Sequence, residues 1–268
     1  MKVAAIQMVS GAEVPGNLDA AAGLLARAGA SGAELAVLPE YFCGMGFSDV
    51  DKLKFQETPG AGPIQDFLSQ QARELGLWIV GGSLPLATAD ANRARNSSLV
   101  FDPTGRCVAR YDKIHLFRFD NGVESYDEAR GLDPGTQAVT FDLASNDGSS
   151  YRIGLSICYD LRFPELYRKL RADLLLIPSA FTFTTGQAHW EVLLRARAIE
   201  NLAYVLASAQ GGVHENKRRT WGHSMIVHPW GQILAQHDEG PSVIMAEVLK
   251  GDLQSARTRL PALSHTVL

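Results

Sequence analysis

Cys158 is the residue of this sequence best placed to act as a nucleophile. It follows residues 151–157, a mostly apolar run that predicts a buried strand, and it precedes residues 159–164, where the chain turns toward a helix. A thiol at the carboxyl end of a strand lies where open α/β sheets hold their reactive groups, and a nearby helix N-terminus favours the thiolate. The alternative is a buried structural cysteine, since free thiols are often small core residues.

Two further ionisable residues follow predicted strands in the same way. Glu40 comes after the apolar run at 35–38, and Lys113 comes after residues 106–112. A thiol nucleophile needs a base for its proton and a positive charge for the oxyanion, and these side chains would supply both if they met Cys158. A dry pocket would raise the pKa of Glu40, which suits a base near neutral pH, and Lys113 would oppose that shift. The structural alternative is a salt bridge at a sheet edge.

Strand and helix signals alternate along the chain and must position these residues. Strands are predicted at residues 2–8, 34–38, 77–81, 96–102, 106–112, 139–143, 151–157, 172–177, 204–208, 224–227, 232–235 and 242–248. Helices are predicted at residues 17–30, from Pro63 to 75, at 187–201 and at 249–259. Residues 114–137 show no period and are predicted to form a long functional loop. The pattern indicates one α/β domain over residues 1–268, with mixed sheets and outer helices.

Composition excludes several classes of protein. The net charge of −4 gives no electrostatic reason for binding nucleic acid or an anionic membrane, and no apolar stretch reaches the roughly 20 residues of a membrane helix. Three cysteines in a chain of 268 residues argue against a disulfide framework, and no secretory leader is recognisable, so we expect a cytoplasmic protein. The basic run at 217–219 is either a solvated loop or a patch that meets an anionic substrate.

Several segments together resemble the nitrilase superfamily of carbon–nitrogen hydrolases. They are Pro39-Glu40, residues 111–116, residues 156–160, His189-Trp190 with residues 195–201, and residues 222–226 with 229–231. The resemblance implies a four-layer αββα sandwich. It implies that Glu40 is the general base, Lys113 the oxyanion stabiliser and Cys158 the nucleophile, which would form a thioester with the acyl half of an amide.

The same resemblance implies a second glutamate in the loop before Pro134-Gly135. Glu128 matches this position best, and Glu124 is the alternative because the length of the loop can differ. Elsewhere, the chain departs from the family's pattern at two positions. His228 stands where an aspartate is expected, and no arginine follows His265. Neither departure involves the three residues proposed for the chemistry, but both leave the identity of the substrate undetermined.

Residues 162–165 and 179–182 resemble the branch of the superfamily that cleaves terminal amides of 2-oxo acids. The implied substrate is deaminated glutathione, which would give 2-oxoglutarate and cysteinylglycine. The alternatives are an ω-amidase acting on 2-oxoglutaramate, an N-carbamoyl-amine hydrolase, and an inactive scaffold or binding protein on the same fold. A Cys–His hydrolase is a further mechanism, which predicts that replacing one histidine abolishes acylation while Glu40→Gln is tolerated; we expect the reverse.

Substrates of this class carry carboxylates, so a cation should line the pocket. Arg162 is the first candidate, and its alternative is an ion pair with Glu165 at a helix start. Tyr159 would contribute its backbone N–H to the oxyanion together with Lys113. Phe181 and Thr182, in a predicted loop at 181–186, would form a wall of the pocket, although the phenylalanines there could simply pack in the core.

We predict no metal, no cofactor and a self-associating protein. His223 and His228 are five residues apart across a strand, and no second ligand has zinc-site spacing. The glycines at 44 and 46 lack the third glycine of a dinucleotide fingerprint. The predicted helix at 187–201 lies at a dimer interface in many members of the superfamily, so the resemblance implies a homodimer or larger homo-oligomer.

Overall fold

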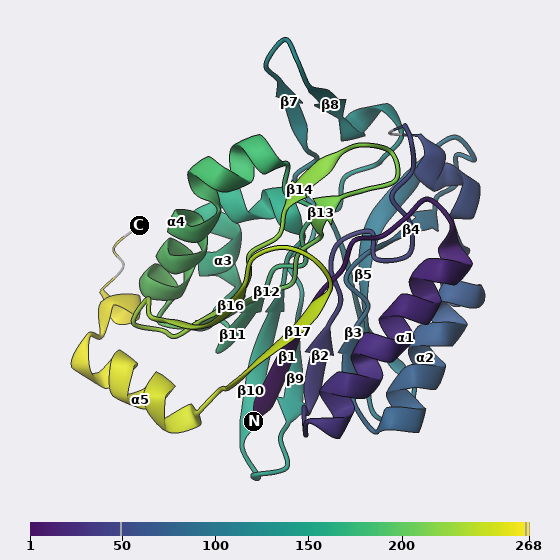
Figure 1. Cartoon of the computed structure of the whole chain (residues 1–268). Coiled ribbons are helices and arrows are strands. Elements are labelled where there is room, and N and C mark those ends of the chain that lie inside the picture. Colours follow the sequence, from purple (N-terminus) through teal and green to yellow (C-terminus); the bar gives the residue numbers. More distant parts are fainter. Residues whose placement is uncertain (49, 266, 268) are drawn as a thin grey trace.

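Two β-sheets pack face to face, and helices cover the outer side of each (Figure 1). The computed structural model describes residues 1–48, 50–265 and 267. The first sheet runs in the spatial order β17 (Ser242–Glu247), β1 (Lys2–Gln7), β2 (Leu35–Val37), β3 (Trp78–Val80), β5 (Ala94–Phe101) and β4 (Leu84–Ala87), and β6 (Cys107–Asp112) also pairs with β5. The second sheet runs in the order β16 (Ile233–His237), β15 (Ser224–Val227), β12 (Tyr204–Ala207), β11 (Leu174–Leu176), β10 (Ser150–Leu155) and β9 (Thr140–Ala144).

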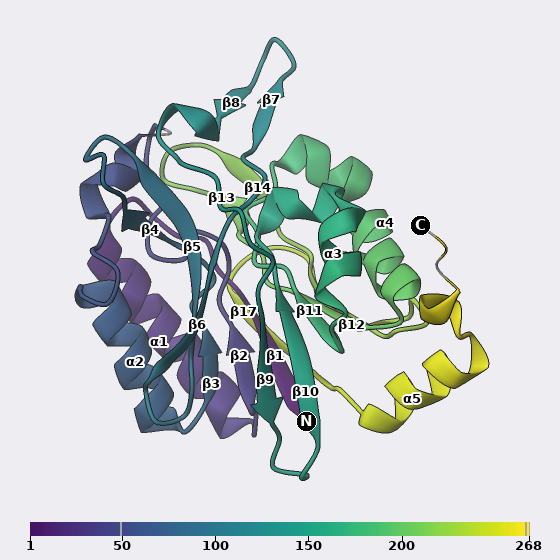
Figure 2. The ribbon, with the colours of Figure 1, turned by 180° about the vertical axis from the view of Figure 1, so that it is seen from behind.

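The helices α1 (Val14–Ala30) and α2 (Pro63–Leu75) cover the first sheet, while α3 (Pro164–Leu170) and α4 (Phe183–Asn201) cover the second (Figure 1, Figure 2). A last helix, α5 (Lys250–Arg259), follows β17. Strand β1 shows how the layers divide the side chains. Val3 and Ala5 belong to the core that contains both sheets, and Ala4 and Ile6 belong to the core beneath α1 and α2. Alternation with period two therefore serves two buried layers at once.

The strands that precede the three candidate residues end on the same side of the structure. In the first sheet, β1, β2 and β3 are parallel, and β6 has the direction of β3 because both are antiparallel to β5. Glu40 after β2 and Lys113 after β6 therefore emerge at one edge of this sheet. Cys158 follows β10, which lies in the parallel core of the facing sheet with β11 and β12.

The predictions of loops at residues 114–137 and 181–186 are wrong in part. Residues 114–137 contain a ribbon of β7 (Arg118–Asp120) and β8 (Ser125–Asp127), followed by a 3₁₀ turn at Glu128–Arg130. This ribbon projects from the body of the molecule in both views (Figure 1, Figure 2), so its short strands lack the buried, period-two pattern that predicts a strand. Residues 183–186 are the first turn of α4, because the hydroxyl of Thr182 accepts a hydrogen bond from Thr185 N at 3.4 Å and caps the helix.

The sequence patterns also missed three short strands. They are β4 and the two strands of a separate ribbon, β13 (Gly211–Val213) and β14 (Arg219–Trp221). The remaining 3₁₀ turns lie at Asp51–Phe55, Cys158–Arg162 and Ala262–Ser264. In the part of the chain that the structure describes, no helix has the length and apolar character needed to cross a bilayer.

Candidate active site

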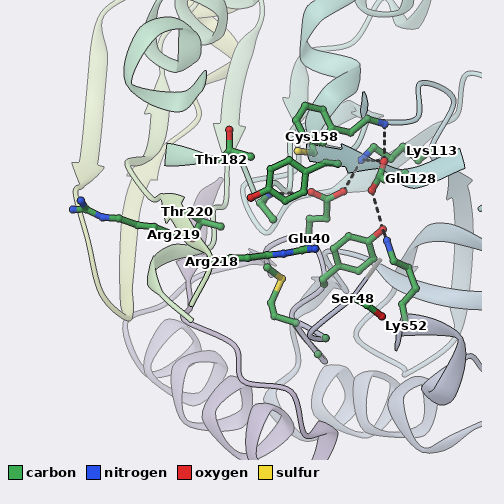
Figure 3. A pocket seen from close by; sticks show the side chains of 17 residues that line it. Glu40, Ser48, Lys52, Lys113, Glu128, Cys158, Thr182, Arg218, Arg219 and Thr220 are labelled. Atoms are coloured by element: carbon green, nitrogen blue, oxygen red, sulfur yellow. Dashed lines mark hydrogen bonds and ion pairs between the residues drawn. The ribbon is translucent and has the colours of Figure 1, made fainter. Parts of the chain in front are cut away.

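A cavity opens where the strand ends converge (Figure 3), and Glu40, Lys113, Glu128 and Cys158 all line it. Glu40 is almost fully buried and has three hydrogen-bond donors around its carboxylate. Lys113 Nζ and Asn96 Nδ2 donate to Oε1 at 2.8 and 2.9 Å, and the backbone N–H of Ala180 donates to Oε2 at 2.9 Å. These donors come from both sheets, so they hold the carboxylate in one orientation.

Glu128 meets the same ammonium group from the other side. Lys113 Nζ lies 2.8 Å from Glu128 Oε2 and 2.8 Å from Glu40 Oε1. The backbone N–H of Phe117 and the hydroxyl of Tyr41 also donate to Glu128, at 2.8 and 3.0 Å. The alternative residue, Glu124, lies in the projecting ribbon region and accepts a hydrogen bond from Thr184 at 3.3 Å. The structure thus brings Glu128, and not Glu124, to Lys113.

Lys113 and the two glutamates stabilise one another in their charged forms. Burial would lower the pKa of Lys113, but the negative charges of Glu128 and Glu40 outweigh it and hold that pKa well above its ordinary value. Burial likewise tends to raise the pKa of Glu128, but the positive charges of Lys113 and Lys52 hold it below its ordinary value. Lys113 is therefore an ammonium and Glu128 a carboxylate at neutral pH.

Cys158 is the strained first residue of the 3₁₀ turn that follows β10. Its φ of 51° is in the left-handed region, which non-glycine residues seldom occupy. The buried carboxylate of Asp160 stabilises the turn, since it accepts hydrogen bonds from Ile157 N at 2.9 Å, Tyr111 OH at 2.6 Å and His115 N at 3.0 Å. The strain is thus maintained by contacts to segments distant in the chain.

The thiol itself is protonated at rest. Burial and the negative charge of Glu40 raise the pKa of Cys158 well above its ordinary value, and the positive charge of Lys113 opposes them only in part. An attack by sulfur therefore requires a base that takes the proton. Glu40 lies in the same cavity and offers a carboxylate for that role (Figure 3).

A second, smaller cavity adjoins the first at Cys158, Phe117, Ala180 and Thr182. Tyr159, Arg162 and Phe181 line it as well. Arg162 lies with its guanidinium 5.7 Å from the ring centre of Tyr159 and 5.5 Å from that of Phe181, and it donates to His189 Nδ1 at 3.2 Å. Phe181 also packs against Trp190, so it serves the core and the cavity wall together.

Several residues of the site escaped the sequence patterns. Asn96 and Tyr41 touch the two glutamates, and Lys52 Nζ donates to Tyr41 OH at 3.1 Å. Neither a strand end nor a motif singled them out; the position of Tyr41 directly after Glu40 was the available signal. Of the basic run at 217–219, Arg218 and Arg219 line the larger cavity, which favours the patch over the solvated loop. Within the described residues, no group of three or more His, Cys, Asp or Glu side chains could hold a metal ion.

Comparison with known proteins places this site in a family. The carbon–nitrogen hydrolase family model matches residues 2–258. Deaminated glutathione amidase of Synechocystis is 42% identical over 98% of this chain and 97% of its own length, and human omega-amidase NIT2 is 34% identical over 97% and 92%. The crystal structure of Saccharomyces cerevisiae Nit3, a member of branch 10 of the nitrilase superfamily, matches with a TM-score of 0.86 and 31% identity over 97% of this chain and 94% of that one. The predicted sandwich fold is confirmed, and the chain belongs to the carbon–nitrogen hydrolase family.

Proposed function

We propose that this protein is an amidase that hydrolyses the amide of deaminated glutathione to 2-oxoglutarate and cysteinylglycine. The observation that carries the proposal is the ammonium of Lys113 held at 2.8 Å by two buried carboxylates beside a protonated thiol. Such a site supplies a base, a positive charge and a nucleophile in one cavity. The name of the Synechocystis relative supports the choice of substrate.

Acylation begins when Cys158 Sγ attacks the amide carbon and its proton passes to Glu40. Electrons move onto the carbonyl oxygen, which Lys113 and the backbone N–H of Tyr159 stabilise. Among the described residues two carboxylates accept from the ammonium, so its third N–H can point to the oxyanion. Collapse of the intermediate breaks the C–N bond, and Glu40 returns the proton to the leaving amine. A thioester with Cys158 results.

Deacylation uses the same groups in reverse order. Glu40 takes a proton from water, whose oxygen attacks the thioester carbon, and Lys113 again stabilises the oxyanion. The C–S bond then breaks, the sulfur regains the proton, and the acid leaves. Glu128 fixes Lys113 between the two steps, since an ammonium anchored on both sides cannot rotate away from the reacting carbon.

Arg162 is proposed to bind the carboxylate of the 2-oxoacyl half in the smaller cavity. The aromatic rings of Tyr159 and Phe181 beneath its guanidinium hold it in place, and Thr182 offers a hydroxyl at the junction of the cavities. An ion pair with Glu165 was the alternative, but among the described residues the Arg162 side chain forms its hydrogen bond with His189.

The decisive experiment measures 2-oxoglutarate release from deaminated glutathione and from 2-oxoglutaramate. Wild-type protein should hydrolyse deaminated glutathione faster, Cys158→Ala should be inactive, and Glu40→Gln should lose about 10²–10⁴-fold in kcat while it remains folded. A preference for 2-oxoglutaramate would support the omega-amidase alternative, which the relationship to NIT2 favours. Turnover of neither compound would exclude this substrate class, and N-carbamoyl amines would be next.

The setting proposed for this activity is a cytoplasmic homodimer or larger homo-oligomer, without nucleic acid or membrane partners. All three cysteines are free, which suits a reducing compartment. Helix α4 exposes Val192 and Ile199, and Trp230 is exposed as well. An apolar surface of this kind is typical of subunit interfaces. Sedimentation equilibrium tests the assembly, and a concentration-independent monomer would contradict it.

A further inference from the structure

The two cavities that meet at Cys158 each contain an arginine of their own. Arg162 lines only the smaller cavity and Arg218 lines only the larger one, whereas Cys158 lines both. An amide under attack has two halves, an acyl half and an amine half, and both extend from the carbon that meets sulfur. The geometry therefore offers one cation to each half of the substrate.

The position of the general base decides which half enters which cavity. Glu40, Lys113 and Glu128 line the larger cavity and are absent from the described lining of the smaller one. The leaving amine must receive its proton from Glu40, so it departs on the side of the larger cavity. The acyl half then occupies the smaller cavity, which Arg162 lines.

Several cations line the larger cavity. Its described lining includes Lys52, Lys113, Arg218 and Arg219 together with the carboxylates of Glu40 and Glu128. Lys113 lies between the two carboxylates. Arg219 is exposed, and its side chain extends away from the other labelled residues (Figure 3). Arg218 points toward Glu40 (Figure 3), so it is the arginine of this cavity that a leaving group beside the base can meet.

The backbone around Arg218 is tied down before any ligand arrives. Its N–H donates to Asn216 Oδ1 and its carbonyl accepts from His214 N, each at 2.9 Å. The buried ring of His214 bridges Ser10 O at 2.9 Å and Thr220 Oγ1 at 2.7 Å, which anchors the β13–β14 ribbon to the loop after β1. The guanidinium of Arg218 lies 4.9 Å from the ring centre of Tyr126. A cation held this way loses little freedom on binding an anion.

We infer that Arg218 binds a carboxylate on the amine half of the substrate, so that the enzyme favours amides whose leaving group is an anionic amine such as a dipeptide. The inference rests on the proposed function and refines it: Arg162 recognises the acyl carboxylate, and Arg218 recognises the carboxylate at the far end of the leaving group. Guanidinium and carboxylate form paired, charge-assisted hydrogen bonds, which gives this contact its selectivity over a neutral amine.

The test compares Arg218→Gln with Lys217→Gln on two substrates. Lys217 is the exposed neighbour of Arg218 on the same ribbon and is absent from both described cavity linings. Its replacement by glutamine removes the same charge as Arg218→Gln does. Arg218→Gln should lower kcat/KM for deaminated glutathione about 10- to 100-fold, mainly through KM, because a charged hydrogen bond is lost in ground and transition states alike. Turnover of 2-oxoglutaramate, which releases ammonia, should change less than about twofold, as should both activities of Lys217→Gln.

A change in the substrate provides the complementary test. Deaminated glutathione with its terminal carboxylate converted to an amide should be a poorer substrate for wild-type protein by the same factor, and Arg218→Gln should not discriminate between acid and amide. Arg162→Gln should impair both natural substrates. Equal losses on both substrates in Arg218→Gln, or wild-type indifference to the terminal carboxylate, would overturn the inference.

Protection of Cys158 from iodoacetamide separates failure of this inference from failure of the proposed function. Serylglycine, a dipeptide without a thiol to consume the reagent, should slow alkylation of wild-type and Lys217→Gln protein but not of Arg218→Gln. If wild-type protein hydrolyses neither amide yet the dipeptide protects in this manner, the proposed function fails and the amine subsite stands. If the dipeptide protects none of the three proteins, or protects all equally, the assignment of Arg218 is wrong.

Discussion

Replacing Lys113 by methionine should destabilise the protein far more than removing a lysine from the surface. The ammonium lies 2.8 Å from a carboxylate oxygen of both Glu40 and Glu128, and all three side chains are at most 9% exposed. Loss of one partner from a buried ion pair costs about 3–5 kcal/mol, because the remaining charge is left without compensation. Repulsion between the two carboxylates left behind adds to this cost, unless one of them takes up a proton.

Lys54→Met is the matched control. Lys54 pairs with Asp51 at 2.9 Å, nearly the same length, but its side chain is 78% exposed. Such surface pairs contribute about 0–1 kcal/mol. Urea unfolding followed by circular dichroism would measure both variants against wild-type protein. We expect Lys113→Met to lose at least about 3 kcal/mol at pH 7 and Lys54→Met to lose less than about 1 kcal/mol.

The pH dependence gives the prediction a sign. In wild-type protein the pKa of Glu128 is below its ordinary value, so its contribution to stability is present above an unfolded-state pKa of about 4.3 and disappears as pH falls through the folded-state pKa. In Lys113→Met, Glu128 loses the larger of the two positive charges that lower its pKa, so burial should raise its folded-state pKa above that of the unfolded chain. The variant then gains stability relative to wild type as pH falls from about 7 to 5. Equal losses in the two lysine variants, or a Lys113→Met loss that stays constant over this range, would refute the reasoning.

Two further substitutions test the scaffold of the site. Asp160→Asn should cost about 2–4 kcal/mol and lower kcat, because the buried carboxylate accepts four hydrogen bonds, from Ile157, Tyr111 and twice from His115, that an amide cannot all accept. Thermal unfolding and amide turnover check this, and an unchanged midpoint would contradict it. Gly82→Ala should cost about 3 kcal/mol, because a Cβ at this φ of 48° would lie 2.0 Å from the carbonyl oxygen of Pro39, next to Glu40. Gly148→Ala, where φ is 81° and nothing lies within 4 Å of the added atom, should cost only about 1 kcal/mol; similar losses at both glycines would show that backbone conformation alone, and not contact with Pro39, sets the cost.

Local patterns in the sequence were sufficient for the elements and for the candidate chemistry. Apolar runs that end on Glu40, Lys113 and Cys158 predicted strand ends, and the strands preceding all three are present in the structure. Spacing in the segment after Pro63 predicted α2, whose buried face includes Ile64, Leu68 and Ala72. These predictions succeed because burial of one face is written into the chain at intervals of two or about four residues. Threonine is a residue type that often caps helices, and α4 begins at Phe183 behind the cap of Thr182, four residues before the predicted start at 187.

Only the tertiary structure decided which side chains surround the reacting groups. Ala180 donates to Glu40 across 140 positions of the sequence, and Tyr41 reaches Glu128 across 87. Arg218 belongs to a short ribbon that the patterns missed, and it reaches the cavity because His214 anchors that ribbon to the loop after β1. Such neighbours depend on the order of strands in two facing sheets and on the packing of loops between them. Residue spacing along one chain carries no record of that order, because segments distant in sequence become adjacent only when the layers pack.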